Sequence, residues 1–252
     1  MHTRDRQRTS VLSAPIDVLD WPTAITRIEN WAARRENRYV CICNAHSVVT
    51  ASKDPAFHEV IRNADMATPD GAPVAWMMRK SGFPTQQRIN GPDLMLHCCE
   101  RAARTGTGVF LFGSLPGTLA ALQPVLARQF PELRIVGALS PPFREPDATE
   151  DAAIVQTIND SKAGIVFVSL GCPKQEFWMA AHRSRIHAVT IGVGAAFDFH
   201  AGTVKRAPRW MRDSGFEWLH RLASEPRRLW QRYLVTNSLF VIKACRQLLR
   251  QR

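Results

Sequence analysis

Asp70 stands between a proline and a glycine in the stretch ATPDGAPV, residues 67–74. Pro sets φ, Asp hydrogen-bonds the nearby backbone and Gly accepts a positive φ, so Pro-Asp-Gly between apolar residues predicts a turn. A carboxylate held in a loop after a strand can also take the proton of an attacking hydroxyl, as a general base. The two roles are compatible, and the rest of the sequence has to decide whether Asp70 has both.

Glycine and polar residues follow several other apolar runs. Asn44 comes directly after RYVCIC, and the stretches GSLPG (113–117), GCPKQE (171–176) and GVGAAFD (192–198) follow further runs. Backbone N–H groups exposed by glycine beside a helix start can hold a diphosphate, although Gly and Pro can also serve only to shape such loops. Three loops of this kind favour a nucleotide site. The candidate substrate-binding residues in these positions are Asn44, Gly71, Gly113, Ser114, Gly171, Pro173, Gly194 and Asp198.

Other chemistries receive less support. Cys41 and Cys43 share one face of an expected strand near His46, but no second ligand pair follows, so we expect no metal site. Cys172 occupies a position suited to a nucleophile, but no flanking residue supplies its base. No Asp-x-Asp occurs to clamp a metal-bound sugar nucleotide, so arginines and backbone amides would have to neutralise a departing diphosphate. We expect no cofactor, because the dinucleotide fingerprint G-x-G-x-x-G is matched only in its first half by GVGAAF.

Short apolar runs alternate with helical patterns over most of the chain. The expected strands lie at 38–43, 65–69, 107–113, 133–139, 163–171 and within 187–197. The expected helices lie at 46–64, with a break near Pro55, and at 93–104, 118–130, 149–160 and 175–185. Continuously apolar strands are typical of a parallel sheet covered on both faces. We therefore predict an α/β fold with a Rossmann-like, mostly parallel sheet and helices on both faces, whose ligands bind outside the carboxyl ends of the strands.

The charge is concentrated in the last fifty residues. The chain of 252 residues carries a net charge of +11, and residues 203–252 hold twelve basic residues against three acidic ones. Three of the seven tryptophans, Trp210, Trp218 and Trp230, lie in the same segment. We therefore expect an α/β catalytic domain at 1–202, with residues 1–10 disordered, and a basic helical C-terminal appendage at 203–252.

Six cysteines without a disulfide spacing, no secretory signal and no apolar run of about 18 residues indicate a cytoplasmic protein, soluble or peripheral at a membrane.

Several of these stretches together resemble one family. ADMATPDGAPVAW, RINGPDL, VFLFGSLPG, VSLGCPKQEFWM and the long block from IGVGAAFDFHAG to RRLWQRYL are similar to the WecG/TagA/CpsF family of bacterial glycosyltransferases, glycosyltransferase family 26. The likeness covers roughly residues 38–234 in consistent order. It implies an inverting, metal-independent enzyme that moves a sugar from a UDP-sugar to a sugar on a polyprenyl diphosphate. Such enzymes act at the inner face of the cytoplasmic membrane, in surface polysaccharide or teichoic-acid synthesis.

The resemblance also implies roles for single residues. Asp70 in TPDG matches the family's proposed catalytic base, and Arg88 in RINGPDL matches an arginine expected near the sugar or the diphosphate. Gln175 in CPKQE matches a polar pocket residue, and Asn44 matches the Asn after the first strand. Many members carry Thr two residues before that Asn, whereas this chain has Ile42, so the donor sugar can differ. N-acetylmannosamine, its uronic acid and glucose remain open as donor sugars, as does a homo-oligomer.

The same likeness implies that the basic appendage docks on an anionic membrane near the lipid acceptor and helps to complete the active site. The candidate docking residues are Lys205, Arg206, Arg209, Arg212, Arg221, Arg227 and Arg228. An ordinary packed terminal helix with a solvated basic face remains the alternative for its last stretch.

Two other functions stay open at this point. A basic segment with aromatic residues can bind nucleic acid, but it shows neither zinc-finger spacing nor an RNP-like strand, so we expect no nucleic-acid partner. A nucleotide-dependent oxidoreductase is disfavoured by the incomplete fingerprint.

Overall fold

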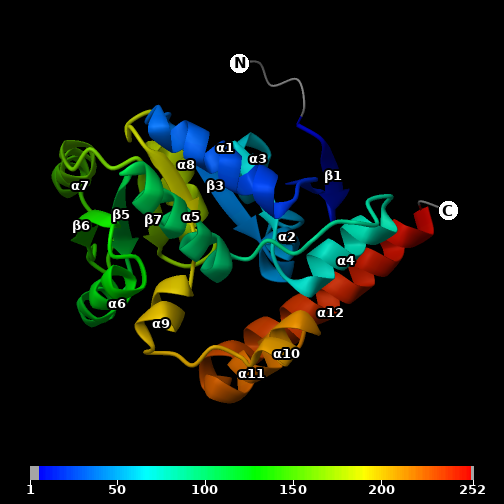
Figure 1. Cartoon of the computed structure of the whole chain (residues 1–252). Coiled ribbons are helices and arrows are strands. Elements are labelled where there is room, and N and C mark those ends of the chain that lie inside the picture. Colours follow the sequence, from blue (N-terminus) through cyan, green and yellow to red (C-terminus); the bar gives the residue numbers. More distant parts are fainter. Residues whose placement is uncertain (1–5, 251–252) are drawn as a thin grey trace. The chain divides into compact units, whose positions relative to one another are not determined.

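The structure is a computed structural model that describes residues 6–250, except for the side chains of Asp213, Arg228 and Arg232. Its strands are β1 (Arg8–Val11), β2 (Ala14–Asp17), β3 (Arg38–Cys43), β4 (Met66–Pro69), β5 (Gly108–Gly113), β6 (Arg134–Leu139), β7 (Ile165–Ser169) and β8 (Val189–Gly192). Its helices are α1 (Trp21–Ala33), α2 (Ala45–Ala51), α3 (Pro55–Asn63), α4 (Ala72–Lys80), α5 (Gly91–Thr105), α6 (Pro116–Gln129), α7 (Ala148–Asp160), α8 (Lys174–His182), α9 (Ala196–Ala201), α10 (Arg209–Asp213), α11 (Glu217–Ser224) and α12 (Pro226–Arg250) (Figure 1).

A six-stranded sheet with the order β4-β3-β8-β7-β5-β6 forms the core. Strand β3 pairs with β8, β8 with β7, β7 with β5 and β5 with β6, and all four pairs are parallel. The strands between the edges are mostly apolar and are buried except for Arg38 at the start of β3, with Phe110, Phe112 and Phe167 among the largest fully buried side chains. Edge strand β6 is more exposed. The predicted α/β fold with a parallel sheet is therefore confirmed.

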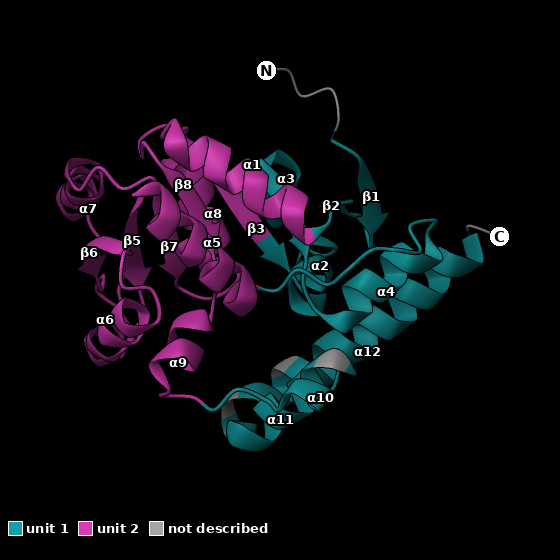
Figure 2. Ribbon diagram, in the orientation of Figure 1, with its two compact units in different colours: residues 1–20, 42–90, 205–252 teal, residues 21–41, 91–204 magenta. Residues whose placement is uncertain are grey.

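Two compact units share this chain (Figure 2). Unit 1 comprises residues 1–20, 42–90 and 205–252, and unit 2 comprises residues 21–41 and 91–204. The chain passes from unit 2 to unit 1 within β3, after Cys41. The expected domain boundary at residue 202 stays a prediction.

Local sequence signals account for most helix starts. Asn44 caps α2, because its side-chain oxygen accepts from two backbone N–H groups of the first turn. Asp54 caps α3 in the same way, with Pro55 at the first helical position. The expected break near Pro55 thus separates two helices. Asp147 and Glu150 form a capping box at α7.

An N-terminal hairpin was not expected. β1 and β2 pair antiparallel, with Arg8 opposite Asp17. The turn between them has positive φ at Leu12 and Ser13. Because these positions hold neither Gly nor Asn, the sequence lacks the usual signal of a hairpin turn. Residues 8–10, which were expected to be disordered, belong to β1, whereas the same expectation for residues 1–5 lies outside the described residues.

Asp17 fastens this hairpin within unit 1. Its side chain is fully buried and accepts a bidentate ion pair from Arg6 at 2.5 and 2.7 Å. It also accepts from the backbone N–H of Ala67 in β4 at 2.5 Å. The hairpin is therefore bound to the strand that leads to Asp70.

The C-terminal segment ends in α12, which packs along one face within unit 1. Its buried residues, Leu229, Thr236, Phe240 and Ala244, recur at helical spacing. Lys243 donates to Ser52 after α2, and Gln247 bonds the hairpin turn at Leu12 and Ser10.

The other side of α12 exposes apolar side chains. Those of Trp230, Leu234, Val235, Val241, Ile242 and Leu249 are each about half exposed or more. The alternative of a packed helix with a solvated basic face therefore fits only in part, because much of the exposed face is apolar. Within residues 6–250, none of the helices is both long enough and apolar enough to cross a membrane.

Candidate active site

Asp70 lies directly after β4, where backbone hydrogen bonds fix its place in unit 1. Its N–H donates to the carbonyl of Cys43, the last residue of β3, at 2.9 Å. The next backbone bond on β4 joins the N–H of Ile89 to the carbonyl of Pro69, also at 2.9 Å. That bond brings Arg88 beside Asp70, although 18 positions separate the two residues.

Arg88 joins two carboxylates. Its Nε donates to Asp70 Oδ1 at 3.2 Å and its Nη2 donates to Glu217 Oε2 at 2.5 Å. Its Nη1 donates to the carbonyl of Arg212 at 3.3 Å. The side chains of Asp70, Arg88 and Glu217 are 17%, 22% and 13% exposed, so the cluster is shielded but still open to a ligand. We call these three residues the carboxylate–guanidinium cluster.

Burial and charge act in opposite directions on this cluster. Burial raises the pKa of Asp70, and the nearby Glu217 raises it further, while Arg88 lowers it; the net change is upward. For Arg88, burial lowers the pKa, but Asp70 and Glu217 outweigh it and the net change is again upward. Asp70 is therefore a stronger base than an ordinary aspartate, and Arg88 keeps its charge.

Asp70 also makes the turn that its neighbours predict. Its Oδ1 accepts from the N–H of Gly71 at 2.6 Å, and Gly71 has φ +80°, a conformation that favours glycine. Both side-chain hydrogen bonds end on Oδ1, and among the described residues none ends on Oδ2. Asn44 serves as the cap of α2, with its side chain bonded to the N–H groups of His46 and Ser47. Asp70 therefore makes the turn through Oδ1 alone.

The loops of unit 2 at the carboxyl ends of β5, β7 and β8 include Gly113, Gly171 and Gly194, and we call them the glycine loops. They lie on the same side of the sheet, because these strands are parallel. Ser114, after β5, donates its N–H to the carbonyl of Ser169 at the end of β7, at 2.9 Å. The Ser169 hydroxyl donates to the carbonyl of Gly194 after β8, at 2.7 Å. Gly113, Ser114 and Gly194 of the predicted set are thus brought together by two hydrogen bonds.

Gly113 has no room for a side chain. Its φ is +110°, and a Cβ there would lie 2.4 Å from the backbone oxygen of Ser169. Ser114 also has a positive φ, +61°, which is uncommon for a residue with a side chain. The turn after β5 is therefore held in a specific conformation at the start of α6.

Gln175 and Asp198 form hydrogen bonds to these loops. Gln175 is buried, and its Oε1 accepts from the N–H of Gly194 at 3.1 Å while its Nε2 donates to Glu176. Asp198 accepts hydrogen bonds from Ser114 and Thr118 at 3.5 and 3.3 Å. Gln175 therefore holds the backbone of Gly194, and Asp198 holds the hydroxyls of Ser114 and Thr118.

A family comparison covers both units. The model of the Glycosyl transferase WecG/TagA/CpsF family matches residues 9–252. The chain belongs to this family. It is therefore a glycosyltransferase, which takes a sugar from a donor and passes it to an acceptor. The WecG/TagA/CpsF assignment confirms the predicted resemblance and favours the enzyme over the nucleic-acid-binding and NAD-dependent alternatives.

The remaining predicted residues of this WecG/TagA/CpsF member are placed as follows. Gly171 has φ +78° and lies with Pro173 in the turn before α8. The docking candidates all lie in unit 1, where Lys205, Arg209 and Arg227 are exposed, whereas Arg206, Arg212 and Arg221 are half-buried. Arg206 donates to Asn90 at 3.2 Å. The side chain of Arg228 lies outside the described residues.

Sequence reasoning missed Glu217 and Thr118. Glu217 had one usable signal, because it is one of only three acidic residues among twelve basic ones in residues 203–252. Thr118 follows GSLPG and had no signal of its own.

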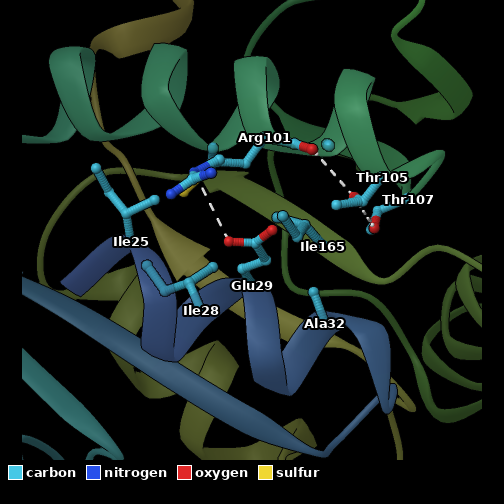
Figure 3. Close-up of a pocket in the computed structure, with 10 residues that line it drawn as sticks. Ile25, Ile28, Glu29, Ala32, Arg101, Thr105, Thr107 and Ile165 are labelled. Carbon is cyan, nitrogen blue, oxygen red and sulfur yellow. Dashed lines mark hydrogen bonds and ion pairs between the residues drawn. The ribbon is translucent and has the colours of Figure 1, made fainter. Parts of the chain in front are cut away.

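A small cavity in unit 2 lies elsewhere. It is lined by residues of α1 and α5, including Ile28, Glu29 and Arg101, as Figure 3 shows. Thr107 and Ile165 line it from the amino ends of β5 and β7, at the edge opposite the glycine loops. Its volume of about 10 Å³ suits at most one water molecule, so it is no sugar site.

Proposed function

We propose that this glycosyltransferase moves a sugar from a UDP-sugar to a sugar carried on a polyprenyl diphosphate, with inversion and without a metal ion, during synthesis of a bacterial surface polysaccharide or teichoic acid. The observation that carries the proposal is Asp70, a half-buried carboxylate of raised pKa that is held by Arg88 directly after a strand. The family assignment and the absence of Asp-x-Asp from the sequence support it.

Asp70 would act on the acceptor. As the acceptor hydroxyl oxygen forms its bond to the anomeric carbon, the bond from that carbon to the diphosphate breaks, and Asp70 takes the hydroxyl proton. A single displacement of this kind inverts the anomeric configuration. An aspartate of ordinary pKa, about 3.9, is a weak base at neutral pH, so both the raised pKa and the fixed position of Asp70 favour this role.

Arg88 has capacity beyond holding Asp70. A guanidinium has five N–H donors, and three of them are directed to Asp70, Glu217 and the carbonyl of Arg212. We propose that the others contact the diphosphate, where a planar, permanently charged group stabilises the departing UDP.

The glycine loops of unit 2 are proposed to bind the nucleotide. Gly113, Ser114 and Gly194 expose backbone at the carboxyl ends of parallel strands, where nucleotides bind in open α/β sheets. The start of α6 at Pro116 adds the positive end of a helix dipole. Gln175 holds the backbone of Gly194 and Asp198 holds the hydroxyl of Ser114, so both contribute by positioning these loops.

The C-terminal segment is proposed to dock at the inner face of the cytoplasmic membrane. Exposed Lys205, Arg209 and Arg227 can pair with anionic headgroups, and the exposed apolar side chains of α12 can enter the interface. This combination of exposed basic and apolar residues supports a peripheral membrane enzyme.

The test combines substrate choice with one substitution. Purified enzyme is incubated with labelled UDP-sugars of the N-acetylmannosamine, mannosaminuronic acid and glucose types and a short-chain prenyl-diphosphate sugar. We expect one donor to give an inverted disaccharide product. Asp70→Asn keeps the size of the side chain and should lower turnover by about 10² to 10⁴ while leaving stabilisation by UDP unchanged.

Asp54→Asn in the same unit is the matched control, because Asn caps a helix about as well as Asp. Wild-type turnover in Asp70→Asn would contradict the assignment of the base. Transfer that disappears with a chelator and returns with Mg²⁺ would contradict metal independence.

A further inference from the structure

Glu217 is an unexpected member of the carboxylate–guanidinium cluster. It lies in the first turn of α11, in the segment with the largest excess of basic residues. Its side chain is only 13% exposed, and its Oε2 lies 2.5 Å from Arg88 Nη2. Burying a carboxylate is costly unless a charge and hydrogen bonds compensate it, and Arg88 supplies both. The contact is therefore a specific ion pair across 129 positions of sequence.

The geometry fixes the orientation of Arg88. Its Nε donates to Asp70, its Nη2 donates to Glu217, and its Nη1 donates to the carbonyl of Arg212. Without Glu217, the long Arg88 side chain would keep one ion pair, at 3.2 Å, which is the longer of the two. Ordering such a long side chain costs rotamer freedom, and the ion pair with Glu217 offsets this cost.

Charge gives Glu217 a second effect. When both carboxylates are ionised, the cluster has a net charge of −1. The single positive charge of Arg88 then compensates Asp70 and Glu217 together. An arginine that faced Asp70 alone would stabilise the ionised carboxylate fully and weaken it as a base.

We propose that Glu217 is a positioning residue for the sugar transfer: it holds Arg88 in place and shares its charge, so that Asp70 is oriented by Arg88 and still accepts a proton. The proposal rests on the proposed function of Asp70.

The sign of the effect can be worked out from the groups around Asp70. The described groups that act on it are Arg88, Glu217 and the N–H of Gly71. Glu217 raises the pKa of Asp70, so its neutralisation lowers that pKa. Glu217→Gln keeps the shape and one hydrogen-bond acceptor but removes the charge. The acidic limb of the pH profile of kcat/KM should then move to lower pH, and the plateau of kcat should fall about tenfold.

Two further variants test whether the effect depends on the position of the Glu217 carboxylate and whether loss of any carboxylate from this segment has the same effect. Glu217→Asp keeps the charge on a shorter arm, so we expect lower kcat with the acidic limb unchanged. Glu225→Gln removes a carboxylate from the same segment outside the cluster, and its profile should match that of the wild type. A purely structural role of Glu217 would lower the melting temperature and leave the acidic limb of the folded enzyme in place.

The inference is overturned if Glu217→Gln folds and shows the wild-type acidic limb and kcat. Should that variant fail to fold, Glu217→Asp decides, because wild-type kcat in it would exclude a positioning role and a loss of about tenfold with unchanged stability would support one. Failure of the proposed function looks different, since Asp70→Asn would then retain full turnover. Loss of turnover in Asp70→Asn together with an unchanged Glu217→Gln refutes this inference alone.

Discussion

Asp17→Asn is expected to destabilise unit 1 strongly. Its carboxylate is fully buried and accepts from Arg6, from Ala67 N–H and, at 3.4 Å, from Arg8. The substitution removes the charge and turns one acceptor into a donor that faces other donors. The buried partners then lack an acceptor, which is more costly than the loss of an exposed pair.

The magnitude follows from these contacts. Removing one partner of a buried ion pair typically costs about 3–5 kcal/mol. Arg6 and Arg8 are 22% and 23% exposed, so they regain some hydration, and we expect the lower end, about 3 kcal/mol. For a chain of this size that corresponds to a fall in melting temperature of about 6–12 °C.

The assay is equilibrium unfolding of the full chain in urea, monitored by fluorescence and by circular dichroism. The midpoint should fall for Asp17→Asn and stay near the wild-type value for Asp54→Asn, where the amide still caps α3. A loss of less than about 1 kcal/mol would refute the reasoning, because it would place Asp17 among ordinary surface ion pairs.

Two further predictions concern the loops and the membrane. Gly113→Ala should lower the melting temperature and weaken stabilisation by UDP, because its Cβ would meet the Ser169 oxygen at 2.4 Å; Gly117→Ala in α6, where nothing lies within 4 Å, is the control and should be neutral or slightly stabilising. Arg209→Gln with Arg227→Gln should weaken binding to anionic vesicles by about thirtyfold, since each basic residue contributes about 1 kcal/mol. Arg128→Gln with Lys162→Gln, exposed in unit 2, removes the same charge and should leave binding unchanged; equal loss in both pairs would contradict docking by the C-terminal segment.

Local patterns in the sequence predicted the sheet and the loops. The apolar runs that became β3, β5 and β7 are visible without any partner, and Pro-Asp-Gly predicted the turn at Asp70 from its own chemistry. The expectation that ligands bind outside the carboxyl ends of parallel strands put Gly113 and Gly194 on the same side of the sheet.

Pairings across long separations could not be predicted in the same way. Nothing near Glu217 indicates Arg88, and nothing near Asp17 indicates Ala67, because a hydrogen bond between distant segments leaves no periodic signal. The β1–β2 hairpin was missed for a local reason, since Leu12 and Ser13 adopt positive φ without being Gly or Asn. The expectation that Gln175 lines a pocket stays a prediction, and the bonds of its amide to Gly194 and Glu176 had no signal in the sequence.

The bonds of Gln247 to the hairpin turn bear on the order in which the protein is made. Unit 1 draws on the first, middle and last parts of the chain, so its hairpin waits for α12 until translation is nearly complete. Arg88 likewise waits for Glu217 while more than a hundred residues are added. During synthesis domains tend to fold as their residues emerge, and unit 2 has all of its residues once position 204 has been added. A ribosome that stops before Glu217 would therefore release a chain that can form the glycine loops of unit 2 but has no complete carboxylate–guanidinium cluster.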